Sequence, residues 1–242
     1  MSRMATASHA SGGEPIFPGM AKGAIIALLV AEFIPIIYRF DYTWFVLSGS
    51  SVIGMVDDGM GGMSLWSLLN PLFLVTGVFK VSAYAVLLFL GTTRWPPLIV
   101  LLVLAFVSSV VGLIELIMVN LDYAWGPEYL LQRAVYLFFQ MFVGVYFGLV
   151  LMMARRYLFG LLALLAGVFS LGLAATNVVL WFDPYGGSFI SDVVSFFSHV
   201  FAWLGILSMT TVLVACIFLR ARPAPPRRRL NGVGHVNEVS NG

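Results

Sequence analysis

The fold is decided by residues 130–182, which read LLQRAVYLFFQMFVGVYFGLVLMMARRYLFGLLALLAGVFSLGLAATNVVLWF. Two apolar runs, 130–153 and 157–182, are separated by a short segment that contains Arg155 and Arg156. Each run is longer than the roughly 20 residues that a helix needs to cross the hydrocarbon core of a bilayer. Neither run shows the apolar–polar alternation of a membrane β-barrel strand. Because backbone groups in lipid must be hydrogen-bonded internally, we predict two membrane helices joined by a short basic connection.

The same kind of apolar run recurs along the rest of the chain. The predicted spans are 22–40, 66–90, 97–119, 130–153, 157–182 and 193–219. Pro96 and Pro97 stand at the start of the third span, where a missing amide N–H costs little. Pro35 lies inside the first span, where we expect a kink. The sequence therefore predicts an all-α integral membrane protein, a bundle of six transmembrane helices.

Charge alternates along the chain in step with these spans. One set of ends and connections is basic: Arg3, Lys22, Arg94, Arg155, Arg156, Arg220, Arg222 and Arg227 to Arg229. The other connections are acidic: Asp41, Asp57, Asp58, Asp122, Glu128, Asp183 and Asp192. Because cytoplasmic loops keep Lys and Arg, we expect both termini to be cytoplasmic.

The composition excludes an ordinary soluble domain. The 242 residues are 60% hydrophobic and 10% charged, whereas a soluble domain has about 25% charged residues. We expect a six-helix membrane domain at 22–219, between a polar cytoplasmic tail at 1–21 and a basic, proline-rich cytoplasmic tail at 220–242. The basic tail predicts contact with anionic lipid headgroups. The uneven charge orients a membrane protein and does not indicate nucleic-acid binding, and we expect a plasma membrane or a bacterial inner membrane.

The connection from Asp41 to Ser64 is largely apolar over Tyr42–Met55 but too short to cross the membrane again. We predict an interfacial or re-entrant segment in this first outer loop. Asp57 and Asp58 follow it, and this acidic pair resembles the one in large polytopic glycosyltransferases that use lipid-linked sugars. That resemblance implies a membrane enzyme acting on a lipid-linked substrate. Six helices are few for that fold, and solvated loop residues are the alternative interpretation.

Two ionisable residues, Glu32 and Lys80, fall near the centre of the bilayer by their distance from the span ends. An isolated charge there costs about 3 to more than 10 kcal/mol, so we expect the two side chains to pair. Two interpretations are open. The pair either locks the first two helices together, or it forms a proton- or ion-coupled site.

A second polar layer is expected nearer the outer surface. Glu115, Arg133, Asn177 and His199 come from four different spans and lie at similar predicted depths. If their helix faces converge, they line an outward-open polar vestibule above Glu32 and Lys80. The alternative is that Glu115 pairs with Arg133 at the interface and His199 is satisfied locally.

Small residues at a spacing of four predict close helix packing. They are Gly144, Gly148, Ala166, Ser170 and Ala174, for which we expect contacts within the chain or between copies in a homo-oligomer. With three histidines and one cysteine spread over the chain, we expect no metal and no cofactor.

The sequence leaves three functions open. The first is a non-catalytic accessory, scaffold or binding subunit with a membrane-protein partner, because no catalytic motif is present. The second is a small solute or proton-coupled transporter that uses the midplane pair and the outer vestibule. The third is the membrane enzyme on a lipid-linked substrate.

Overall fold

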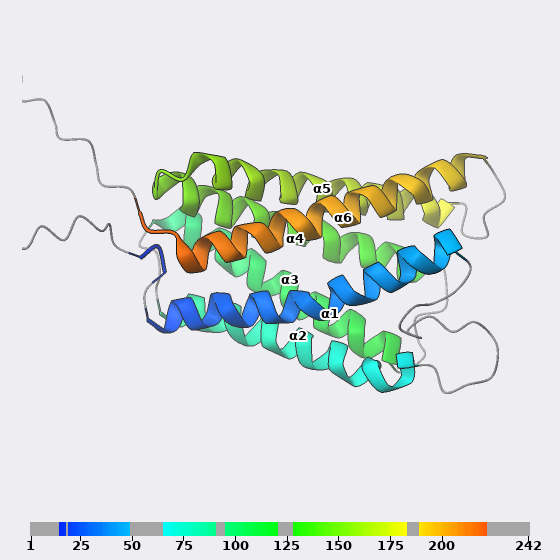
Figure 1. The fold of residues 1–242 in the computed structure, drawn as a ribbon, viewed down its shortest axis with the longest axis horizontal. Coiled ribbons are helices and arrows are strands. Elements are labelled where there is room, and N and C mark those ends of the chain that lie inside the picture. Colours follow the sequence, from blue (N-terminus) through cyan, green and yellow to red (C-terminus); the bar gives the residue numbers. More distant parts are fainter. Residues whose placement is uncertain are drawn as a thin grey trace, which may run out of the picture.

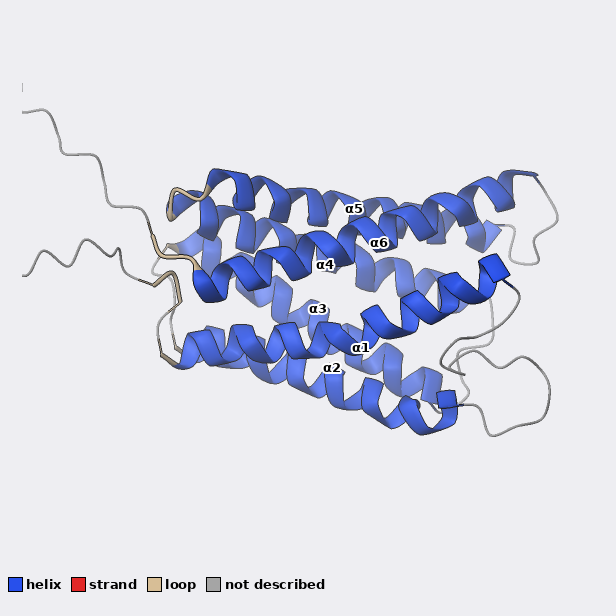
Figure 2. Ribbon diagram, in the orientation of Figure 1, coloured by secondary structure: helices blue, strands red, loops and turns tan. Residues whose placement is uncertain are grey.

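The computed structural model describes residues 15–17, 19–48, 65–90, 95–120, 128–182 and 189–221. Within these ranges the chain forms six long helices and no strands (Figures 1 and 2). The helices are α1 Met20–Ser48, α2 Leu65–Phe89, α3 Pro96–Asn120, α4 Glu128–Met153, α5 Tyr157–Phe182 and α6 Phe189–Phe218. Each contains a stretch that is long and apolar enough to cross a membrane. The predicted class, a polytopic six-helix membrane protein, is confirmed.

The helices form a closed ring. Each helix packs against the helices before and after it in the chain, and α6 returns to pack against α1. The most extensive packing joins α4 to α5, the two helices of the stretch that decides the fold. Figure 1 shows the helices running up and down the long axis of the molecule. The space enclosed by the ring is therefore bounded by side chains from all six helices.

The tight turn between α4 and α5 is held by its own backbone. The amide of Arg156 donates to the carbonyl of Leu151 at 2.8 Å, and that of Arg155 donates to Met152 at 2.9 Å. Arg155 has a φ of 59°, the left-handed conformation that ends many helices in this hydrogen-bond pattern. Because the turn is so short, α5 must run antiparallel to α4 and lie directly beside it.

Three chain segments meet at one end of the bundle. Pro15 forms an isolated antiparallel bridge with Arg220, just after α6. Nε and Nη2 of Arg156, in the turn between α4 and α5, donate to the carbonyl of Arg220 at 2.9 and 2.6 Å. The start of α1, the end of α6 and the basic turn therefore share one end of the bundle (Figure 1).

Helix α1 is longer than the sequence predicted. The expected span ended at residue 40, whereas the helix continues to Ser48. Residues 42–47 contain no proline or glycine that would stop it, and Gly49 follows directly. Pro35 lies inside α1, and Figure 1 shows that this helix changes direction along its length, as a proline that removes a backbone donor would cause. Residues 49–64, with the second half of the expected re-entrant segment and with Asp57 and Asp58, lie outside the described residues.

The basic residues at the end of the bundle shared by the start of α1 and the end of α6 predict which side of the membrane that end faces. A reporter fused after Arg229 is expected in the cytoplasm and one inserted at Gly61 is expected outside, because basic connections stay inside. Enzymatic reporters that are active on only one side of the membrane measure this directly. Activity of both fusions on the same side would contradict the six-span topology.

Glycines bring α4 and α5 into close contact. A Cβ atom at Gly144 would lie 2.6 Å from the carbonyl oxygen of Ala163 and 2.6 Å from the amide nitrogen of Gly167. One at Gly160 would lie 2.9 Å from the carbonyl oxygen of Gly148. We call these residues, Gly144, Gly148, Gly160, Ala163 and Gly167, the glycine seam. Without a hydrophobic driving force in lipid, such close backbone approach is a main source of helix association.

Candidate functional site: a central cavity with charged walls

A cavity of about 370 Å³ lies inside the ring, and all six helices line it. Its lining residues lie between positions 32 and 39 in α1, between 109 and 116 in α3 and between 129 and 144 in α4. These segments belong to the half of the bundle away from Pro15 and Arg220. The volume falls in the range of about 300–1,000 Å³ that small-molecule sites occupy.

The other half of the bundle is filled by apolar side chains. Leu87 on α2, Leu151 on α4 and Leu213 on α6 are at most 1% exposed, and they belong to one continuous buried cluster. Phe17, before α1, packs its ring edge-on against Phe147 at a centroid distance of 6.2 Å. A molecule in the cavity therefore meets a well-packed apolar barrier toward the end that holds the termini.

Glu32 and Lys80 face each other in the wall of this cavity. Nζ of Lys80 lies 2.7 Å from Oε1 of Glu32, and both residues line the cavity. The Lys80 side chain is 18% exposed and the Glu32 side chain is 15% exposed. An ion pair at this distance offsets much of the cost of placing two charges at mid-helix in a membrane. The pair links α1 to α2 and also presents charge to the cavity.

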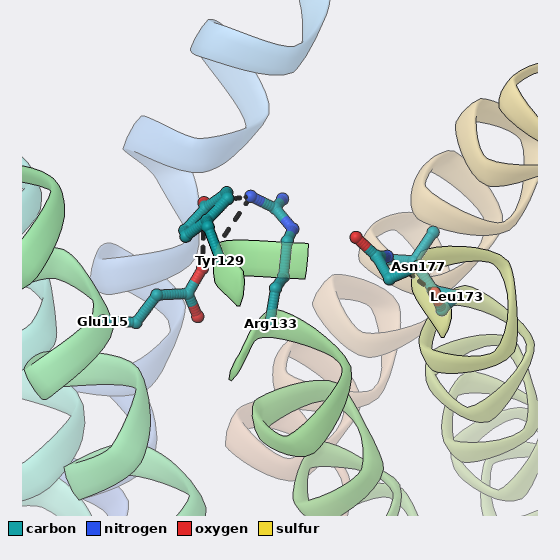
Figure 3. Close-up of polar contacts among 5 residues, drawn as sticks. All are labelled: Glu115, Tyr129, Arg133, Leu173 and Asn177. Carbon is teal, nitrogen blue, oxygen red and sulfur yellow. Dashed lines mark hydrogen bonds and ion pairs between the residues drawn. The ribbon is translucent and has the colours of Figure 1, made fainter. Parts of the chain in front are cut away.

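A second charged cluster consists of Glu115, Tyr129 and Arg133. It lies nearer the end of the bundle opposite Pro15 and Arg220. The Tyr129 hydroxyl donates to Oε1 of Glu115 at 3.0 Å, and Nη1 of Arg133 donates to the Tyr129 oxygen at 2.7 Å. Arg133 and Glu115 themselves are 3.8 Å apart. Figure 3 shows Tyr129 between the two charged groups. The carboxylate and the guanidinium are thus joined mainly through a phenol hydroxyl.

Asn177 and His199 are not among the residues that line the cavity. Nδ2 of Asn177 donates to the carbonyl of Leu173 on its own helix at 2.7 Å, and the residue is 5% exposed (Figure 3). Nδ1 of His199 lies 2.8 Å from the carbonyl oxygen of Ser195, also on its own helix. Of the six polar residues that the sequence singled out, the structure brings Glu32, Lys80, Glu115 and Arg133 to the cavity.

The five small residues that the sequence singled out occupy three environments. Gly144 and Gly148 belong to the glycine seam. Ala166 and Ser170 line the cavity, and the Ser170 hydroxyl donates to the carbonyl of Ala166 at 3.0 Å. Ala174 packs in a smaller buried cluster with Leu137, Leu173 and Ala202. Spacing by four on α5 therefore selected a face that is partly cavity wall.

Six polar side chains in the wall were missed by the sequence reasoning: Arg39, Thr76, Tyr84, Tyr129, Tyr136 and Gln140. A signal for the three on α4 exists in the sequence. Tyr129, Arg133, Tyr136 and Gln140 are spaced by four, three and four residues, which places them on one face of α4. A polar stripe of this kind in an otherwise apolar span predicts a face turned away from lipid.

The described part of the chain contains no group of three or more His, Cys, Asp or Glu side chains that could hold a metal ion. Comparison of the chain with protein-family models, curated proteins and solved structures finds no match.

Proposed function

We propose that this membrane protein binds a small molecule in the central cavity and transports it. The observation that supports this most is that the Glu32–Lys80 ion pair is part of the wall of a cavity lined by all six helices. Charged groups at membrane depth are costly, and in such proteins they usually mark the path of a substrate or an ion. The binding site lies near the middle of the bundle, as in many secondary transporters.

The asymmetry of the bundle adds to this support. The cavity occupies the half away from the termini, and the half near the termini is tightly packed with Leu87, Leu151 and Leu213. A binding site that is closed on one side is one of the states that an alternating-access cycle requires. By the charge pattern of the connections, this state would face outward.

The geometry favours transport over the role of a non-catalytic accessory subunit. Such a subunit could link α1 and α2 with apolar residues, and replacing a buried ion pair by well-packed apolar groups is often neutral or stabilising. Two charged clusters around one internal cavity therefore carry a free-energy cost that packing alone does not require. Recognition of a solute gives those charges a role.

The proposal predicts that thiols placed in the cavity wall react with an external reagent. Ser109 and Ser170 line the cavity on α3 and α5, and Ser→Cys changes little in size. In sealed membranes, Ser109→Cys and Ser170→Cys should each be labelled by a small, membrane-impermeant methanethiosulfonate added outside. Mass spectrometry of the purified chain would count the added groups.

The native Cys216 supplies the internal control for this labelling. It is 1% exposed and lies in the packed half of the bundle, so the wild-type chain should remain unlabelled. If both variants were as unreactive as Cys216, the cavity would be closed to solutes. The transport proposal would then fail, and the accessory role would become the better explanation.

A further inference from the structure

The two sides of the cavity differ in chemistry. The wall formed by α5 and α6 is apolar except for Ser170, and includes Phe169, Leu173, Phe201, Ile206 and Met209. The Phe169 and Phe201 rings are nearly parallel, with centroids 6.3 Å apart and an interplanar angle of 25°. All the charged lining residues come from the opposite wall, formed by α1 to α4. A molecule that fills the cavity therefore has one apolar side and one polar side.

The carboxylates of the polar wall are already engaged. Oε1 of Glu32 lies 2.7 Å from the ammonium of Lys80. Oε1 of Glu115 accepts the Tyr129 hydroxyl at 3.0 Å, and the Glu115 side chain is only 11% exposed. Each carboxylate also has a cation close by, Lys80 for Glu32 and Arg133 for Glu115. These neighbouring positive charges offset the attraction that the two acidic groups would exert on a cationic ligand.

Hydrogen-bond donors, in contrast, are left over. Tyr84 and Tyr136 both line the cavity, and no hydrogen bond joins either hydroxyl to another described residue. Oε1 of Gln140 accepts from Ser108 at 3.2 Å, which leaves its amide N–H groups for another partner. These three polar groups face the cavity, where a bound ligand or water can accept hydrogen bonds from them.

Arg133 is the strongest of these donors. Its side chain is 36% exposed, more than those of Glu32, Lys80 or Glu115. Within the described chain its one hydrogen bond goes to Tyr129, so most of the five guanidinium N–H groups remain available. A guanidinium with two free N–H groups on one edge matches a carboxylate in a bidentate pair.

We infer that the molecule bound in the cavity is a small amphipathic anion, with a carboxylate held by Arg133 and an apolar ring or chain against Phe169 and Phe201. This inference rests on the proposed function, because it names the class of solute that the cavity takes. The hydroxyls of Tyr84 and Tyr136 and the amide of Gln140 are the further donors to the bound molecule. The Glu32–Lys80 ion pair stays intact while the molecule is bound.

Three probes that share one apolar body and differ only in the head group test the inference: phenylpropionate, phenylpropionamide and phenylpropylamine. Binding to the full chain in nanodiscs would be measured by calorimetry and by protection of Ser170→Cys from the thiol reagent. We expect the carboxylate to bind at least about 10-fold more tightly than the amide or the amine. Hydrogen bonds to charged groups are roughly twice as strong as neutral ones, and that difference corresponds to about a tenfold change in Kd.

Variants of the polar wall show whether Arg133 causes that preference. Arg133→Gln should weaken binding of phenylpropionate by about 10-fold or more and leave that of phenylpropionamide within about 3-fold. Arg133→Lys keeps the charge but loses the planar guanidinium, so it should weaken phenylpropionate binding less than Arg133→Gln does. If Arg133→Gln does not fold, Tyr136→Phe removes one donor without changing charge and should weaken phenylpropionate by about 3- to 10-fold.

The outcomes separate this inference from the proposed function. Binding of the amine as tightly as the carboxylate would overturn the inference of an anion and leave the cavity as a binding site. An unchanged carboxylate preference in Arg133→Gln, or in both Arg133→Lys and Tyr136→Phe, would overturn the assignment of Arg133 as the group that holds the carboxylate. If Ser170→Cys reacts with the reagent but no probe binds, the inference of an amphipathic anion is overturned, whereas the accessible cavity remains. Lack of reaction at Ser109→Cys and Ser170→Cys would remove the binding site itself.

Discussion

Replacing Lys80 alone by methionine is expected to destabilise the protein more than replacing Lys80 and Glu32 together. The single variant leaves the Glu32 carboxylate without the ammonium that now lies 2.7 Å away. Removing one partner of a buried pair costs about 3–5 kcal/mol, because the remaining charge keeps its desolvation cost. Glu32→Leu alone should be similarly costly. Unfolding in detergent micelles, followed by near-UV circular dichroism, would give the order of the variants.

The double variant Glu32→Leu/Lys80→Met should recover most of the stability, because two apolar side chains of similar volume can fill the same space. Its function then distinguishes the two interpretations of the pair. A folded double variant that no longer transports its solute would show that the charges act in the cycle. A fully functional one would reduce the pair to a link between α1 and α2. Lys22→Met is the matched control, because it removes a charge near the start of α1 and not at mid-helix. It should have little effect.

The six helices were predictable because length and polarity alone determine which segments enter a bilayer. The first boundary was less predictable. Nothing in residues 41–48 breaks a helix, so α1 continues to Ser48, and the apolar content that suggested a separate interfacial segment is partly the last turns of α1. Hydropathy indicates where a chain crosses the membrane, whereas local breakers such as Gly49 determine where the helix itself ends.

The charged residues show what depth can and cannot predict. Depth along the helices placed Glu32 level with Lys80, and the two side chains are in contact. Depth also grouped Asn177 and His199 with Arg133, yet both interact with carbonyls of their own helices and neither lines the cavity. Depth defines a layer, but the rotation of each helix about its axis decides which side chains in that layer meet. That rotation depends on packing against neighbours, which a single residue does not encode.

Rotation also explains the small residues of α5. The sequence singled out Ala166, Ser170 and Ala174, which are spaced by four, whereas the residues against α4 are Gly160, Ala163 and Gly167, spaced by three and four. The second spacing repeats every seven residues and follows the seam of two helices that cross at a small angle. Both spacings are present in the sequence, and only the packed bundle decides which one faces α4.

The glycine seam leads to the second large effect, that of Gly144→Ala. The added Cβ would lie 2.6 Å from the Ala163 oxygen, 2.6 Å from the Gly167 nitrogen and 2.8 Å from the Gly167 Cα. All three atoms belong to the backbone of α5, so no side chain can rotate away to make room. The helices would have to separate along the most extensive contact of the bundle. We expect a loss of about 1–3 kcal/mol or more, the range for overpacking a tight core.

Gly23→Ala is the matched control, because a Cβ at Gly23 of α1 meets nothing within 4 Å. There the same change should be neutral or stabilising by up to about 1 kcal/mol, since alanine favours a helix more than glycine does. Thermal unfolding of both variants in the same detergent would show the difference in sign. Equal stability of Gly144→Ala and Gly23→Ala would mean that α4 and α5 are not held by backbone contact. Their antiparallel pairing would then depend on the short turn at Arg155 and Arg156 and on the side chains around the seam.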